Sequence, residues 1–96
     1  MKNEQVKVDE LIQELGGYWT PFKMIAALVE EVGELADEML KVEGVKSGGD
    51  LVRLREEVGD VMFALSCIAN HYGIDLEEAL GESIEKYRRR DMRNGT

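Results

Sequence analysis

The sequence predicts an all-α protein, an antiparallel bundle of about four helices within a single domain over residues 1–96. Glu, Leu, Val and Ala are common, while proline occurs once and aromatic residues six times. This composition favours helices over sheets. Four segments carry apolar residues at helical spacing, separated by glycines or capping residues. Because so short a chain has a thin core, we expect homo-oligomerisation to complete the bundle.

The first helix is expected over residues 3–15, since its apolar residues recur every three or four positions and Gly16-Gly17 follows. The second should begin sharply at Pro21, because Thr20 is a favourable N-cap and proline suits the first helical turn. Its expected core stripe consists of Ile25, Leu28, Val29, Val32, Leu35, Ala36 and Met39.

The clearest loop is GVKSGGD at residues 44–50. Asp50 is expected to cap a third helix that runs to about Tyr72, where Gly73 closes it. Asp75 and Glu78 have the spacing of a capping box for a last helix that reaches about Arg90. Because the loop is so short, the second and third helices should be antiparallel neighbours.

The charge is unevenly distributed. The formal net charge is −8, yet residues 86–93 carry +4, so the rest of the chain holds about −12. This acidic balance argues against a nucleic-acid-binding surface. The separation of acidic and basic residues has two interpretations. The chain could bind a metal and a polyanion together, or the acidic helix faces and the basic tail could simply be solvated.

Cys67 is the only cysteine, which excludes an intramolecular disulfide, and its apolar surroundings in the sequence favour a core position. The amino-terminal residues do not resemble a signal peptide, and no segment has the length of a membrane span. We therefore expect a cytoplasmic protein.

Two nearly identical pentapeptides, EEVGE at residues 30–34 and EEVGD at 56–60, lie 26 residues apart. In each, two carboxylates project from one helical face: Glu31 with Glu34, and Glu57 with Asp60. Antiparallel helices would bring the pairs face to face, where like charges repel unless a cation neutralises them. Oxygen ligands suit Mg²⁺ or Mn²⁺.

One such motif alone is more often a solvated helix face. Its repetition inside two apolar stripes, with Gly33 matched by Gly59, predicts a metal site instead. Each glycine costs about 1 kcal/mol relative to alanine in a helix. We interpret the pair as a sign of close approach at that level, either of the two helices or of a substrate.

The succession Glu-Glu-x-x-Glu and Glu-x-x-Asp resembles the signature of the MazG-like all-α nucleoside triphosphate pyrophosphohydrolases, especially the short single-domain members. The similarity extends over most of the chain, from GYWTP at 17–21 through EEVGELA and EEVGDVMFAL to KYRRRD at 86–91. It implies Mg²⁺-dependent cleavage of (d)NTPs between the α- and β-phosphates, and allows a role in cleansing the nucleotide pool of non-canonical nucleotides. The family's metal ligands carry over to Glu31, Glu34, Glu57 and Asp60.

Within that resemblance, Glu30 and Glu38 are the catalytic candidates for orienting the attacking water. Lys86 and Arg90 lie four residues apart on the last helix and could grip the outer phosphates. Many members have an asparagine shortly before this lysine, whereas here the preceding residues are Ser83, Ile84 and Glu85.

For the base, Trp19 is the best candidate for stacking, and Asn70 could hydrogen-bond its edge or equally lie on the surface. Phe22 is expected in the core. The expected partners are the nucleotide and further copies of the chain, as a homodimer or homotetramer, with neither membrane nor nucleic acid. Two alternatives stay open: a non-catalytic module of the same fold that binds nucleotide or a protein partner, and an acidic helical scaffold without metal.

Overall fold

The computed structural model describes residues 2–93; residue 1 and residues 94–96 of the expected domain lie outside the described part. Within that range the chain forms four helices and no strand: α1 (Lys2–Glu14), α2 (Pro21–Val42), α3 (Leu51–His71) and α4 (Leu76–Arg93). The predicted all-α fold is confirmed, and the last helix extends three residues beyond its expected end. None of these helices is long and apolar enough to cross a membrane.

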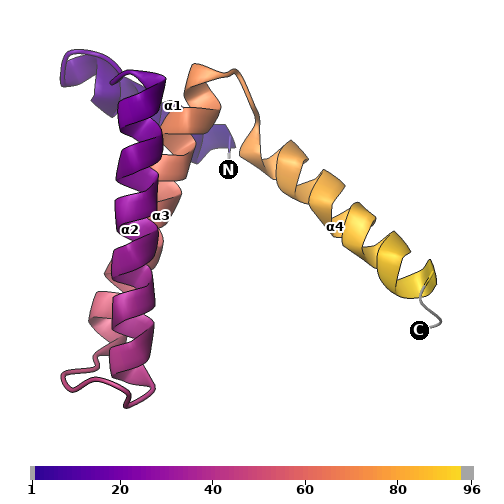
Figure 1. The fold of residues 1–96 in the computed structure, drawn as a ribbon. Coiled ribbons are helices and arrows are strands. Elements are labelled where there is room, and N and C mark those ends of the chain that lie inside the picture. The colour runs from indigo at the N-terminus through magenta and orange to yellow at the C-terminus, as the bar shows by residue number, and fades with distance from the viewer. Residues whose placement is uncertain (1, 94–96) are drawn as a thin grey trace.

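The helices α2 and α3 form an antiparallel hairpin, and α1 packs against α3 at the end where α2 begins (Figure 1). The last helix, α4, diverges from the hairpin (Figure 1). Extensive packing within the described residues is confined to α2 with α3 and α1 with α3. A single chain is thus a hairpin with one helix attached at its end and another directed away.

Three helix starts are fixed by the side chains that the sequence indicated. Thr20 Oγ1 accepts a hydrogen bond from Lys23 N at 3.3 Å, and Asp50 Oδ1 accepts one from Val52 N at 2.8 Å. Asp75 Oδ1 accepts from the backbone N–H groups of residues 77 and 78, at 2.9 and 3.2 Å. Each acceptor satisfies N–H groups that a helix start leaves without a partner.

The face along which α2 and α3 pack together, the α2–α3 seam, carries side chains at intervals of three or four residues. They are at least half-buried on both helices. The seam consists of Met24, Leu28, Glu31, Leu35 and Glu38 on α2, and Leu54, Glu57, Val61, Ala64 and Cys67 on α3. This spacing is typical of antiparallel helices that cross at a small angle. Three glutamates therefore lie within an otherwise apolar seam.

The core of one chain is small. Among the described residues, the buried apolar side chains are Met24, Cys67 and Ala69. Val29, expected in the core, is 63% exposed, and the core position expected for Phe22 is wrong, since that side chain is 85% exposed. The radius of gyration is 16.3 Å, against about 13 Å for a compact chain of this length. One copy therefore leaves apolar helix faces uncovered.

The two glycines matched between the pentapeptides are not required by helix packing. A Cβ at Gly33 or Gly59 would meet no other atom within 4 Å, so the interpretation that α2 and α3 approach closely there is wrong. Approach of a substrate at that level stays a prediction. By contrast, a Cβ at Gly49 would lie 2.3 Å from the carbonyl oxygen of Lys41, because the loop folds back onto the end of α2.

Candidate metal and nucleotide site

Three carboxylates converge near the middle of the hairpin. Glu31 on α2 and Glu57 and Asp60 on α3 each offer an oxygen atom, and these three atoms lie within 4.8 Å of one another. Residues 57 and 60 share a face because they are almost one turn apart, and the antiparallel packing brings Glu31 opposite them. Glu31 and Glu57 are half-buried, whereas Asp60 is exposed. These three side chains are called the carboxylate cluster below.

The cluster contains three of the four carboxylates that the sequence indicated as ligands. Glu34 is exposed and lies outside the group of three. Its charge is nevertheless close enough to raise the pKa of Glu57. The structure thus brings the two motifs together on one face, with Glu34 at its margin.

The electrostatics of the cluster are unfavourable without a cation. Burial in the seam, together with the nearby Glu31 and the charges of Glu34 and Asp60, raises the pKa of Glu57 to about 7. One oxygen of Glu31 and one of Glu57 are buried with no hydrogen-bond partner. Buried acceptors without donors are costly. A donor set made only of carboxylate oxygens fits a hard divalent cation, which would satisfy both atoms.

The two catalytic candidates differ in their surroundings. Glu38 lies in the seam seven residues beyond Glu31, about 10 Å along the helix. Its Oε1 accepts a hydrogen bond from Lys41 Nζ at 3.3 Å, while its Oε2 is buried without a partner. Lys41 also pairs with Asp37 at 3.1 Å. Glu30 is exposed on α2. Neither belongs to the carboxylate cluster.

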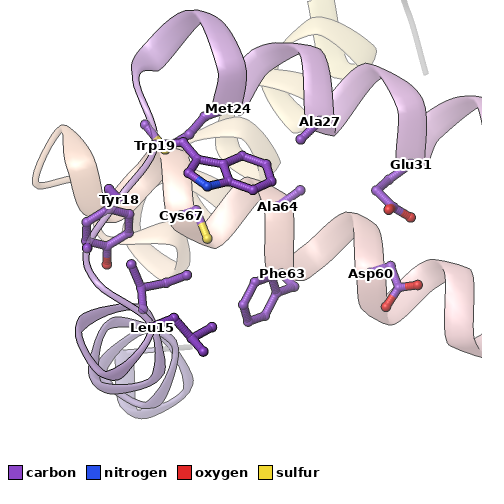
Figure 2. Close-up of a pocket in the computed structure, with 12 residues that line it drawn as sticks. Leu15, Tyr18, Trp19, Met24, Ala27, Glu31, Asp60, Phe63, Ala64 and Cys67 are labelled. Atoms are coloured by element: carbon purple, nitrogen blue, oxygen red, sulfur yellow. The ribbon is translucent and has the colours of Figure 1, made fainter.

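An apolar cavity of about 430 Å³ opens beside the cluster. Figure 2 shows Glu31 and Asp60 at one end of it, Tyr18 and Leu15 at the other, and Trp19, Phe63 and Cys67 between them. The remaining wall comes from α1, the α1–α2 loop and the hairpin: Ile12, Gly17, Met24, Ala27 and Ala64. The volume lies within the range of small-ligand pockets, and two residues of the cluster are also part of the cavity wall.

Trp19 lies in this wall and is 55% exposed. Lys23 Nζ sits 4.2 Å from the centroid of its ring, a cation–π contact. Phe63 and Cys67 were not recognised as cavity residues from the sequence, although they follow Asp60 by three and seven positions and so share its helical face. Cys67 is buried, as the apolar run predicted.

The structure does not bring the other predicted substrate contacts to the cluster within one chain. Asn70 forms hydrogen bonds with Gln5 and Tyr18. Lys86 and Arg90 lie on the diverging α4, where their charged groups are 5.1 and 5.3 Å from the ring centroid of Tyr87. The contacts of these three residues with a nucleotide stay predictions.

The sequence profile of the MazG nucleotide pyrophosphohydrolase domain matches residues 19–93, a range that includes both carboxylate motifs and α4. The chain belongs to this family. The family and the enzyme class predicted from the sequence, a nucleotide pyrophosphohydrolase, are therefore confirmed.

This MazG domain is similar to proteins from two bacterial species. It is 42% identical over 95 residues to YpjD, an uncharacterized protein of Bacillus subtilis, with 95% of this chain and 86% of YpjD covered. It is 33% identical over 84 residues to the nucleoside triphosphate pyrophosphohydrolase of Escherichia coli K12. That match covers 88% of this chain but only 30% of the longer E. coli protein.

Solved structures share the fold. The crystal structure of the Bacillus-conserved MazG protein, a nucleotide pyrophosphohydrolase, is 39% identical with a TM-score of 0.79, and the match covers 90% of this MazG domain and 86% of that chain. The crystal structure of YpjD from B. subtilis is 41% identical with a TM-score of 0.80, over 90% and 92% of the two chains.

Proposed function

We propose that this MazG domain hydrolyses nucleoside triphosphates between the α- and β-phosphates, releasing a nucleoside monophosphate and pyrophosphate, with Mg²⁺ or Mn²⁺ as cofactor. One observation carries the proposal: Glu31 and Asp60 belong both to the carboxylate cluster and to the wall of an apolar cavity. A nucleotide has the same two parts, a flat base and a phosphate chain that pairs with cations. The name of the E. coli relative agrees with this substrate class.

The residues that would hold the cation are Glu31, Glu57 and Asp60, with Glu34 at the margin of the cluster. When bound, a divalent cation neutralises these carboxylates and polarises the phosphate oxygens. Trp19 and Phe63 would receive the base by stacking, and the apolar wall would keep water away from it.

A carboxylate outside the cluster would orient the attacking water. In Glu38 one oxygen is already held by Lys41 and the other is buried without a partner, so the group has a fixed position and a free acceptor. In Glu30 neither condition is met, because the side chain is exposed. The surroundings therefore favour Glu38 of the two candidates.

The decisive assay incubates the purified protein with magnesium and a panel of canonical and oxidised NTPs and dNTPs, and separates the products by chromatography. We expect monophosphate and pyrophosphate in equal amounts, rather than diphosphate and phosphate. Glu57→Gln should lower the rate on the order of a hundredfold. The matched control is Glu56→Gln, which alters an exposed neighbour outside the cluster and should keep full activity.

Two results would contradict the proposal: no pyrophosphate from any nucleotide, or undiminished release by Glu57→Gln. Magnesium-dependent binding of nucleotide without turnover would instead support the alternative of a non-catalytic binding module. Turnover of oxidised or otherwise non-canonical nucleotides in preference to canonical ones would support a role in cleansing the nucleotide pool.

We further propose that the enzyme acts as a homodimer or homotetramer in which α4 of one copy reaches the site of another. The uncovered apolar faces of the hairpin support this, and so do the exposed Leu80, Ile84 and Tyr87 on the diverging α4. The same helix carries Lys86 and Arg90, whose charge is opposite to that of the acidic hairpin. In this arrangement the basic side chains of Lys86 and Arg90 would bind the outer phosphates across the interface.

Mixing two inactive variants tests the shared site. In a dimer formed at random from Glu57→Gln and Lys86→Ala chains, half of the molecules are hybrids, and each hybrid has one fully native site. About one quarter of the wild-type activity should therefore return after joint refolding. If the mixture stays as inactive as its components, α4 does not act across the interface. Sedimentation velocity would distinguish a dimer from a tetramer.

A further inference from the structure

A continuous chain of polar side chains links α1, the α1–α2 loop and the end of α3. Asn70 Nδ2 donates to the carbonyl oxygen of Gln5 at 3.0 Å and to Tyr18 Oη at 3.2 Å, while Asn70 Oδ1 accepts from Gln5 Nε2 at 3.1 Å. Tyr18 Oη in turn donates to Asp9 Oδ1 at 2.5 Å. These four residues, Gln5, Asp9, Tyr18 and Asn70, are called the Tyr18 network below.

The two amide side chains at the centre of the network have hydrogen-bond partners for all their polar groups. Gln5 is only 6% exposed, and its Oε1 and Nε2 also bond to Leu76 N at 2.9 Å and the Ile74 carbonyl at 2.8 Å. Both N–H groups and the oxygen of the Asn70 amide are engaged. Binding a base edge would break these bonds in a largely buried place. The geometry therefore argues for a role of Asn70 that acts through Tyr18.

Tyr18 lies in the α1–α2 loop, which forms one wall of the cavity. The preceding Gly16 and Gly17 have φ angles of +106° and +104°, in the region that favours glycine. Trp19 follows directly, and Leu15, Gly17, Tyr18 and Trp19 all line the cavity. The backbone N–H groups of both glycines donate to carbonyl oxygens of α1. The hydrogen bonds of Tyr18 then link the same loop to Asp9 on α1 and Asn70 on α3, directly before Trp19.

The position of that wall matters because the cavity offers little else for recognition. Apart from Glu31 and Asp60 at one end and the indole N–H of Trp19, the side chains of its lining are apolar or, in Tyr18, already hydrogen-bonded. Affinity for a base must then come from shape and stacking, which depend on where the aromatic wall lies.

We propose that Tyr18 and Asn70 are positioning residues that hold the Trp19 wall of the nucleoside pocket in its binding geometry. The inference rests on the proposed function, because it assigns the cavity to the nucleoside. It predicts that breaking the Tyr18 network weakens nucleotide binding and raises KM, while kcat stays near its wild-type value because the carboxylate cluster is untouched.

The test uses Tyr18→Phe and Asn70→Ala in the full chain. Trp19 is the only tryptophan, so its emission reports the wall directly. We expect a red shift with greater quenching by acrylamide. Affinity for the α,β-methylene analogues of the four dNTPs, measured with magnesium, should be about two- to tenfold weaker. Tyr72→Phe removes an exposed hydroxyl at the end of α3 and serves as the matched control, which should resemble wild type.

A second pair of variants, both at Asp9, distinguishes loss of the Tyr18 hydrogen bond from general unfolding. Asp9→Asn keeps an acceptor for the Tyr18 hydroxyl and should retain wild-type emission and affinity, whereas Asp9→Ala should behave like Tyr18→Phe. If Tyr18→Phe lowers only the melting temperature and otherwise matches Tyr72→Phe, the positioning role is wrong and the network is purely structural. A wild type that neither binds nor cleaves nucleotides overturns the proposed function and this role with it. A wild type that does both, while the variants match it, overturns this inference alone.

Discussion

The affinity for magnesium is predicted to depend on pH through Glu57. Burial in the seam, Glu31 and the charges of Glu34 and Asp60 raise the pKa of Glu57 to about 7 in the metal-free protein. A cation binds the ionised carboxylate, so below about pH 7 each binding event must release a proton. The apparent affinity should then fall about tenfold from pH 8 to pH 6 and change little from pH 8 upward.

The free energy of unfolding of the metal-free protein should also depend on pH. The pKa of Glu57 is about 7 in the folded state against 4.5 for the ordinary side chain. Between these values the folded state binds more protons, so the stability that Glu57 contributes below pH 4.5 is lost as the pH rises through about 7. Magnesium added at pH 8 should raise the melting temperature, and Glu57→Gln should raise it without metal.

Titration calorimetry with magnesium or manganese, at pH 6 and pH 8 and in two buffers of different ionisation enthalpy, measures both the affinity and the released protons. Glu56→Gln should retain the pH dependence, and Glu57→Gln should lose it together with most of the affinity. Equal affinities at the two pH values without proton release would show that Glu57 does not control metal binding. So would a pH dependence that persists in Glu57→Gln.

Three further predictions concern catalysis, backbone packing and assembly. Glu38→Gln should reduce kcat by about 10²-fold or more with KM little changed, while Glu30→Gln stays near wild type; the reverse order in a steady-state assay would exchange their roles. Gly49→Ala should destabilise by about 1–3 kcal/mol because its Cβ would meet the Lys41 carbonyl. Gly81→Ala, in open space on α4, should stabilise the protein by up to about 1 kcal/mol. Thermal melts in which Gly49→Ala and Gly81→Ala shift the melting temperature in the same direction would contradict this. Val29→Asp should shift the oligomer toward monomer in sedimentation velocity, and an unchanged assembly would exclude that face from the interface.

The helices could be predicted because their signals are local. Thr20, Asp50 and Asp75 each bond N–H groups two or three residues ahead, so the sequence contains the whole interaction. The repetition of the carboxylate motif across a short loop likewise predicts that Glu31 and Glu57 meet, since helix geometry and antiparallel packing determine the rest.

The burial of the apolar stripe could not be predicted in the same way. Val29 and Leu28 are adjacent in the stripe of α2, yet only Leu28 lies in the seam of its own chain. Periodicity shows that a face is apolar and does not show which part meets the same chain. The Tyr18 network also left no sequence signal, because Gln5 and Asn70 are 65 residues apart and neither belongs to a motif.

The hydrogen bonds of Gln5 have a consequence for folding. Its bond to Leu76 N closes a segment of 71 residues, about three quarters of the chain, whereas the hairpin needs only the short loop at residues 44–50. Closing this long segment costs more entropy than closing the short loop of the hairpin. The hairpin should therefore form first and α1 should dock last. Native-state amide exchange should then show α1 opening at a lower free energy than α2 and α3, so the cavity wall would be lost before the carboxylate cluster.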